Sequence, residues 1–271
     1  MASPDESLQA WAARLASVAV PVLRTTRDQI EHWRERSDDA DAHVLADLVL
    51  RDPLMCLRVL VNVSQKLGER LTTPVETVTA ALVLTGIEPF FRDFQDLPVL
   101  EDRLAGEPQA LAGALALVER SHRAARLAAA FAIHRQDEDV ELLHQAALLH
   151  DFGHLLLWCE APALALEMAS RQRQDPNLRS AAVQRDLLGF EVEPLALVLM
   201  ERWGLPPALR ELTQPGASVT AGPRTVRLAV QLARHLESGW HNAALPDDFA
   251  EIGHLLNLPA NAAATLARQA L

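Results

Sequence analysis

The sequence has 271 residues, 49% of them hydrophobic, and is long enough to bury one large core or the cores of two lobes. Its net charge of −11 argues against a broad nucleic-acid surface, which would normally be basic, and gives no support for binding anionic lipid. Aromatic residues make up only 4% and tyrosine is absent, so aliphatic side chains must fill the core. This composition predicts a folded protein rather than a disordered one.

The cysteines and the N-terminus bear on the cellular compartment. Cys56 and Cys159 lie far apart, each in an apolar helical stretch, and we expect buried free thiols. No CxxC spacing suggests a zinc site, and no cysteine pattern suggests a secreted disulfide framework. The acidic N-terminus lacks the basic-then-apolar order of a signal peptide, and no apolar stretch approaches the ~20 residues that span a bilayer. We therefore expect a cytoplasmic protein that binds neither membrane nor nucleic acid.

Helix signals follow one another along the first half of the chain. The first helices are expected over residues 7–17, 22–36 and 40–50. Asp52 then suits an N-cap, and Pro53 suits the first helical position, where no N–H bond is needed. Thr73 opens a segment of capping-box form with Glu76 at its third helical position, and Gly86 is placed to end that helix.

The second half continues in the same way. Further helices are expected over residues 107–133, 138–151, 161–174, 178–188, 193–203, 206–213, 223–238, 247–256 and 259–270. No segment alternates with a period of two, so the predicted fold class is all-α. Proline and glycine punctuate residues 96–109 and 213–223, and the first of these stretches is predicted to join two helical lobes.

An adjacent histidine and aspartate stand near the middle of the chain. The apolar helical run 146–149 ends in His150 and Asp151, and Gly153 follows. Neutral imidazole and carboxylate are good ligands for a divalent ion. Neighbouring side chains on a helix point about 100° apart, so other helices must close the cage before the pair can bind a metal.

Several segments, in this order along the chain, resemble the HDOD domain, the HD-related output domain of bacterial signalling proteins. The matching segments are Pro21-Val22-Leu23, Asp52-Pro53-Leu54 through Arg58-Val59-Leu60 to Asn62, Thr73-Pro74-Val75-Glu76 through Gly86, Leu148-Leu149-His150-Asp151-Phe152-Gly153, and Glu201-Arg202-Trp203-Gly204-Leu205-Pro206. The resemblance covers roughly residues 17–215 and implies a two-lobed helical bundle of HD/HDOD type. It implies structural roles for the signature residues Asp52, Pro53, Asn62, Gly86, Trp203, Gly204 and Pro206.

These features predict the domain organisation. An N-terminal helix is expected over residues 1–16, followed by the HDOD-like domain over residues 17–215. Its lobes are expected at about 17–105 and 106–215. A helical extension over residues 216–271 follows, and its amphipathic helices either pack back on the domain or form the seam of a homodimer.

The resemblance also predicts where metal ligands should fall, because HD phosphohydrolases use the ligand order H…HD…D. In the matching register, Arg120 precedes Ser121 at the position of the first histidine. His122 lies two residues later, a rotation of about 200° on a helix. A downstream histidine falls on Val192, and the paired histidines that often follow the WGLP segment fall near Gln214 and Pro215. An arginine cation beside a metal would repel it.

We therefore expect a degenerate metal site without catalysis or cofactor. His150, Asp151 and Gly153 are read as its remnant, kept for structure, and the former cleft is expected to include Arg120, Ser121, His122, His154 and Val192. Gly153 is expected to end or bend the helix between His150 and His154, which disfavours their joint use as ligands. The function that the resemblance implies is a regulatory module that contacts signalling proteins.

Two other functions stay open at this point. One is an active metal-dependent phosphohydrolase on nucleotides, with His150 and Asp151 as ligands and His122 or His154 helping to complete the cage. The other is a sensor that binds a small molecule such as a nucleotide in the former catalytic cleft.

Overall fold

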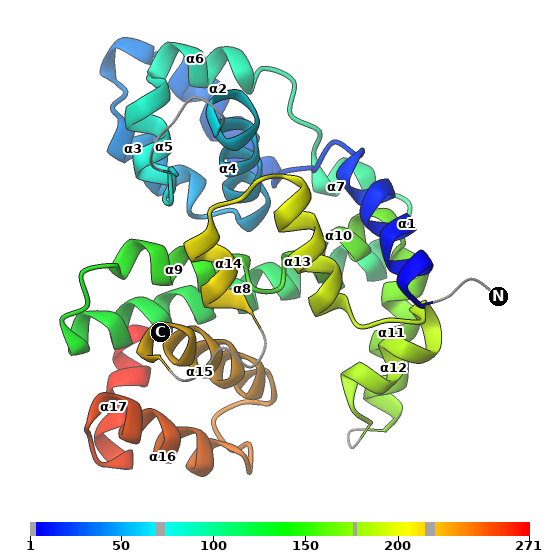
Figure 1. Ribbon diagram of the computed structural model, residues 1–271, viewed down its shortest axis with the longest axis vertical. Coiled ribbons are helices and arrows are strands. Elements are labelled where there is room, and N and C mark those ends of the chain that lie inside the picture. Colours follow the sequence, from blue (N-terminus) through cyan, green and yellow to red (C-terminus); the bar gives the residue numbers. More distant parts are fainter. Residues whose placement is uncertain (1–3, 69–73, 176–177, 215–219) are drawn as a thin grey trace. The chain divides into compact units, whose positions relative to one another are not determined.

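The computed structural model describes residues 4–68, 74–175, 178–214 and 220–271, and the regular elements among them are helices (Figure 1). The α-helices are α1 Pro4–Ala16, α2 Arg24–Arg34, α3 Ala42–Val49, α4 Pro53–Leu67, α5 Val78–Thr85, α6 Ile87–Asp93, α7 Leu100–Arg103, α8 Pro108–Arg135, α9 Val140–Leu149, α10 Phe152–Glu160, α11 Pro162–Gln174, α12 Ser180–Leu188, α13 Val192–Arg202, α14 Pro207–Thr213, α15 Ala221–His235, α16 Leu245–Leu256 and α17 Ala260–Ala270. Two 3₁₀ helices, η1 Ser37–Asp39 and η3 Leu236–Ser238, complete the set. Within these residues, strand-type pairing is limited to an isolated bridge between Val22 and Val99, so the predicted all-α class is confirmed.

The contacts divide the chain into two compact units. Unit 1 combines Met1–Leu117 with Asp151–Leu205, and unit 2 combines Val118–His150 with Pro206–Leu271. These units differ from the predicted lobes 17–105 and 106–215, because α10 and α13 pack with α4 and α1 and so belong with the N-terminal part of the chain. The described part of the expected extension, residues 220–271, belongs to unit 2.

Helix α4 is the centre of unit 1, and a single buried carboxylate fixes its start. The predicted start is confirmed: Asp52 is the N-cap, and its side chain accepts hydrogen bonds from the backbone N–H groups of Leu54 at 2.9 Å and Met55 at 3.2 Å. The same carboxylate accepts a third bond, of 2.7 Å, from the backbone N–H of Leu23. Asp52 therefore joins the segment before α2 to the start of α4. Burial raises the pKa of the Asp52 carboxyl, although these hydrogen bonds oppose the shift.

The predicted start of the next helix is wrong. Pro74 and Glu76 lie outside any helix, and Thr73 lies outside the described residues. Helix α5 begins at Val78, and its N-cap is Thr77, whose hydroxyl accepts a hydrogen bond of 3.2 Å from the backbone N–H of Ala80. The later start places Val78, Ala81 and Leu82 in the core, where α5 packs against α3 and α4. The predicted end is confirmed: Gly86 follows Thr85 with φ of +82°, which suits glycine.

The segment after Gly86 contains structure that the sequence pattern did not predict. Helix α6 begins directly after that glycine, and α7 lies inside the stretch 96–109 that was read as a linker. The Val22–Val99 bridge immediately precedes α7. Helices of seven and four residues are too short to show an apolar period, which is why they were missed.

The expected helix over residues 138–151 ends early and is followed by another. Helix α9 ends at Leu149 and α10 begins at Phe152, so the chain turns at the His-Asp pair. Gly153 was expected to end or bend a helix. It lies instead in the first turn of α10. A β-carbon at Gly153 would lie 3.0 Å from Cγ1 of Val192 and 3.4 Å from Cβ of Ala196 on α13. Glycine therefore suits the close approach of α13, where a β-carbon would push against the Val192 side chain.

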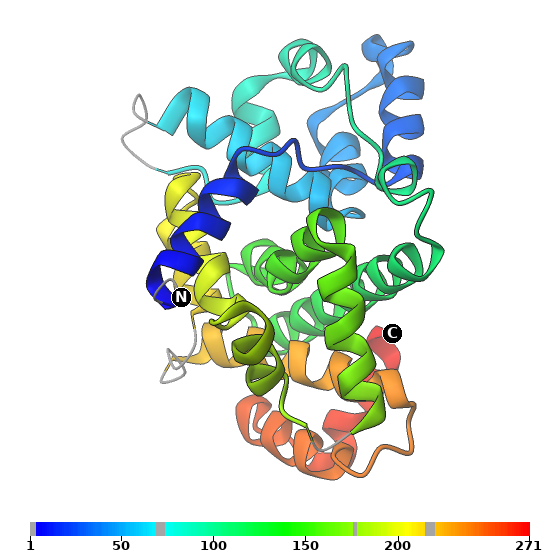
Figure 2. The ribbon, with the colours of Figure 1, turned by 90° about the vertical axis from the view of Figure 1, so that its right-hand side faces the viewer.

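Unit 2 contains the C-terminal helices. Helix α15 packs against α9 and α14, and α16 packs against both α15 and α17. Helices α15, α16 and α17 lie side by side in both views (Figures 1 and 2). Asp248 on α16 is buried and accepts hydrogen bonds from Gln231 at 2.7 Å and from Nδ1 of His235 at 2.6 Å, both on α15. The C-terminal helices thus pack back on α9, one of the two arrangements expected for them.

Two further properties of the described residues follow from burial and helix length. Cys56 and Cys159 are free and buried, as predicted, and burial raises the pKa of the Cys159 thiol to about 12. None of the described helices is both long enough and apolar enough to cross a membrane.

Candidate functional site

The His-Asp pair lies at the junction of α9 and α10. His150 is the C-cap of α9, and Asp151 is the N-cap of α10, where its backbone carbonyl accepts hydrogen bonds from the N–H groups of His154 and Leu155. The Asp151 side chain does not cap α10. Asp151 is only 5% exposed, and the division between the two units falls between these two residues.

A polar network in unit 1 joins His154 to Val192 through Gln184 on α12. The Gln184 side-chain carbonyl accepts a hydrogen bond of 2.9 Å from the backbone N–H of Val192, the first residue of α13. The first N–H groups of a helix have no partner within the helix, so Gln184 satisfies one of them. Its amide nitrogen donates to the Ser180 hydroxyl at 2.8 Å and lies 3.1 Å from Nε2 of His154.

This network fixes the tautomer of His154. The bond from Val192 identifies which end of the Gln184 amide is the carbonyl, so the other end is the NH₂ donor. Because that nitrogen lies against Nε2 of His154, Nε2 must accept and the ring proton must sit on Nδ1. Nε2 of His154 therefore acts as a hydrogen-bond acceptor in this structure.

The position at which the family register predicts a histidine is occupied by apolar packing. Val192 is 1% exposed, and a β-carbon on Gly153 would lie 3.0 Å from Cγ1 of its side chain, closer than an ordinary van der Waals contact. Of the residues predicted for the former cleft, the structure thus brings His154 and Val192 together with Gly153. It does so through Gln184, which the sequence pattern did not indicate.

The predicted cleft residues on α8 lie in unit 2. Arg120, for which the resemblance predicted the position of the first histidine, donates to both carboxylate oxygens of Glu237 in η3 at 3.3 and 3.2 Å. Ser121 is buried, and His122 is half-buried with its Nδ1 4.0 Å from the Glu119 carboxylate. The Arg120 guanidinium is thus held by the C-terminal part of the chain.

These residues do not fit the metal centre that the HD phosphohydrolases use. A guanidinium and an isopropyl group stand at two expected ligand positions, and the imidazole closest in sequence to the His-Asp pair is engaged at Nε2. Across the residues that the structure describes, no three His, Cys, Asp or Glu side chains form a group that could hold a metal ion. Of the two positions expected for the later histidines, Pro215 lies outside the described residues.

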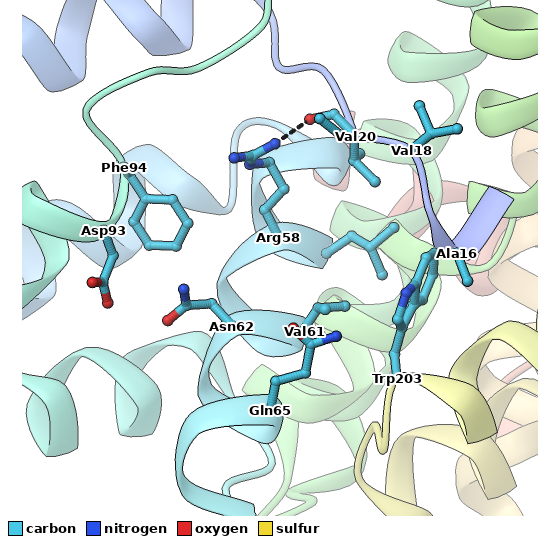
Figure 3. A pocket seen from close by; sticks show the side chains of 12 residues that line it. Ala16, Val18, Val20, Arg58, Val61, Asn62, Gln65, Asp93, Phe94 and Trp203 are labelled. Atoms are coloured by element: carbon cyan, nitrogen blue, oxygen red, sulfur yellow. Dashed lines mark hydrogen bonds between the residues drawn. The ribbon is translucent and has the colours of Figure 1, made fainter. Parts of the chain in front are cut away.

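The remaining signature residues connect α4 to the end of α13. Trp203 is the C-cap of α13 and is buried, with its ring centroid 6.0 Å from that of Phe152. Gly204 follows with φ of +64°, and the Ser64 hydroxyl on α4 donates to its carbonyl. Pro206 is the N-cap of α14. Asn62 lies on the same helix as Ser64 and, with Trp203, lines a cavity (Figure 3).

The comparisons with known proteins agree with this fold. The HDOD domain family matches residues 20–216, and the chain therefore belongs to the HDOD family. The response regulator MmoQ from Methylococcus capsulatus str. Bath is similar in structure, with a TM-score of 0.71 and 22% identity over 93% of this chain and 99% of that one. A virulence factor from Campylobacter jejuni subsp. jejuni gives a TM-score of 0.66 and 17% identity over 97% of each chain.

An HDOD domain protein of unknown function from Geobacter sulfurreducens gives a TM-score of 0.51 and 16% identity, over 98% of this chain and 95% of that one. At these identities the likenesses establish the helical fold of the HDOD type and no activity. No curated protein matches the sequence.

Proposed function

We propose that this protein is a non-catalytic HDOD module that acts in bacterial signal transduction by contacting another signalling protein. The observation that carries the proposal is the network of His154, Gln184 and Val192. In this network Gln184 bonds to the His154 imidazole and to the first backbone N–H of α13. Val192 is also the position at which a metal-dependent relative is expected to have a histidine ligand. The family supports a signalling role, and the MmoQ likeness is to a protein described as a response regulator.

A contact mechanism needs a surface, and α5 offers one. Its eight residues, Val78–Thr85, are apolar on nearly all sides, which is typical of a helix that is buried all round. Val83 and Leu84 are nevertheless 64% and 46% exposed, while the opposite side of the helix packs in the core. Neighbouring exposed apolar side chains of this kind mark interaction sites more often than single ones do.

The net charge of −11 bears on the partner. Two copies of a chain with this charge repel each other, whereas a partner with basic residues around an apolar centre is attracted. We therefore propose a different protein, rather than a second copy, as the occupant of the Val83–Leu84 surface.

The experiment places a photo-reactive amino acid at Leu84 in the full chain, in the bacterium that encodes it. The control carries the same group at Ile133 on α8, which is 64% exposed but lies in unit 2. The captured protein is then purified, and its affinity is measured for the wild-type chain and for Val83→Asp and Leu84→Asp. The proposal predicts a partner captured only from Leu84, with binding weakened about tenfold or more by either aspartate while the melting temperature is unchanged.

Other results would overturn the contact proposal. Equal capture from Ile133, or affinities that the aspartate variants leave unchanged, would show that α5 is not the contact surface. Capture of a second copy of this chain would show self-association instead.

A further inference from the structure

A second feature of unit 1, separate from the His-Asp pair, has the character of a ligand site. A cavity of about 250 Å³ lies along one face of α4, and its lining includes neither Asp151 nor His154. The cavity is lined by Arg58, Val61, Asn62 and Gln65 of α4, together with Leu57, the segment around Val18–Val20, Ala16, Asp93, Phe94 and Trp203 (Figure 3).

Three polar side chains of α4 line the cavity from the same face of the helix. Arg58, Asn62 and Gln65 are four and three residues apart, so they lie on one face of the helix. Figure 3 shows them in a row, with Phe94 on one side and Val18 and Trp203 on the other. The lining combines polar and apolar side chains around a concave space, and small-molecule sites likewise use a few convergent polar groups to orient a ligand.

Arg58 carries the charge of this cavity, and its hydrogen bonding is incomplete. Its Nη1 donates to the backbone carbonyl of Val20, which holds the guanidinium in place. Its Nε is buried, and no acceptor for it lies among the described residues. Arg34 and Arg210 also have a buried Nε of this kind, but of these three residues Arg58 is the one that lines the cavity. A buried donor without an acceptor is costly, and in the described part of the chain the guanidinium is held in place by Nη1 alone.

The charges around Arg58 leave room for an anion. Asp52 is near enough to act on the guanidinium, but its carboxylate is occupied by the backbone N–H groups of Leu23, Leu54 and Met55. Asp93 also lines the cavity, and its carboxylate is paired with Lys66, with Arg92 3.8 Å away. The one carboxylate in the lining is thus already compensated. Burial lowers the pKa of the Arg58 guanidinium, as expected for a cation that lacks a full counter-charge.

We propose that this cavity binds a small organic anion, a carboxylate or a phosphate monoester, through the guanidinium of Arg58 and the amides of Asn62 and Gln65. A guanidinium binds the oxygens of a carboxylate or phosphate through charge-assisted hydrogen bonds. The volume of about 250 Å³ is at the low end for ligand sites, so it suits a small molecule and not a dinucleotide. The proposal does not depend on the absence of metal catalysis.

The test measures the binding of four probes to the full chain by calorimetry: inorganic phosphate, phenyl phosphate, benzoate and benzamide. Benzamide is the uncharged counterpart of benzoate. We expect at least one anion to bind, and benzamide to bind about tenfold more weakly than benzoate if the site takes carboxylates. Whether the phosphates or benzoate bind better distinguishes the two head groups.

The matched variants are Arg58→Gln and Arg92→Gln. Both remove one arginine of unit 1, but Arg92 is 70% exposed and lies outside the cavity lining. Arg58→Gln should weaken anion binding about tenfold or more, and Arg92→Gln should leave it within about twofold. If Arg58→Gln does not fold, Asn62→Leu and the ¹⁵N-detected shifts of the Trp203 indole and the Asn62 amide in the wild-type chain provide the same test.

Two results would overturn the proposal. One is that no anion binds at millimolar concentration. The other is that an anion binds equally well to the wild-type and Arg58→Gln chains. Neither result would bear on the α5 contact or on the metal content of the protein.

Discussion

The side-chain amide nitrogen of Gln184 lies 3.1 Å from Nε2 of His154. This contact joins α12 to α10, and the same amide joins both to α13 through the backbone N–H of Val192. Three helices of unit 1 are thus held together by one buried glutamine next to His154. The histidine here is a hydrogen-bond acceptor within the structure.

The first prediction concerns this network. At neutral pH the ¹⁵N spectrum of the imidazoles should show His154 as the Nδ1–H tautomer, because Nε2 accepts from Gln184. Gln184→Ala should lower the free energy of unfolding by about 1–3 kcal/mol, since the N–H of Val192 loses its acceptor. The control is Gln174→Ala, which removes an exposed amide that also donates to a hydroxyl four residues earlier. It should change stability by less than about 0.5 kcal/mol. Equal effects in urea denaturation would contradict the account.

The second prediction compares two aspartate N-caps. Asp52 is fully buried and also holds Leu23, whereas Asp41 is exposed and caps only α3, through the N–H of Val44. Asp41→Ala should cost about 0.5–2 kcal/mol of unfolding free energy, the ordinary value for a cap. Asp52→Ala should cost about 2–4 kcal/mol, because it adds a buried N–H without an acceptor. Chemical denaturation of both variants measures the difference, and a cost for Asp52→Ala no larger than that for Asp41→Ala would show that the bond to Leu23 contributes nothing.

The third prediction concerns pH. Burial raises the pKa of Asp52 above its ordinary value of 3.8, so the folded state holds the proton more tightly than the unfolded chain. The stabilisation from this group is therefore fully present below pH 3.8 and is lost as pH rises through the folded-state pKa. Urea denaturation across this range should show wild-type stability falling with pH relative to Asp52→Asn, which cannot titrate. A relative stability that rises with pH would mean that the hydrogen bonds outweigh burial.

The fourth prediction separates two effects at glycines with positive φ. Gly189 and Gly204 have φ of +84° and +64°, but only Gly204 is crowded: its β-carbon would lie 2.9 Å from the Ser64 hydroxyl oxygen. Gly189→Ala should cost about 1–2 kcal/mol for the left-handed backbone alone. Gly204→Ala should cost more, and the excess should disappear in the background of Ser64→Ala. A double-mutant cycle by thermal unfolding tests this, and additive effects would contradict a direct contact.

The sequence predicted the start of a helix correctly where a single capping side chain determines it. The prediction was wrong where tertiary contacts determine the start. Asp52 and Pro53 mark a single start, and α4 begins there. Thr73 and Thr77 both offer a hydroxyl for a cap, and the structure uses Thr77 because the residues after it are the ones that the core buries. Gly153 looked like a helix end, but its role is to let α13 approach α10, which no local pattern reveals.

The candidate site was predictable only in part. His154 and Val192 could be named from the family register, but Gln184 could not, because its role depends on the packing of α12 against its neighbours in space. Arg58 could be placed on the right face of α4, yet its unpaired Nε and its cavity depend on segments distant in sequence, around Val20 and Phe94. Spacing along one helix carries no information on such contacts.

We propose that the His150-Asp151 pair of this protein does not hold a catalytic metal ion. The most direct test of this proposal is the metal content of the full chain, purified without chelator, for the wild type and for His150→Ala and Asp151→Ala. The account predicts substoichiometric manganese, iron and zinc in all three proteins. One stoichiometric metal ion in the wild type, lost in both folded variants, would contradict this proposal and would support the alternative of an active phosphohydrolase.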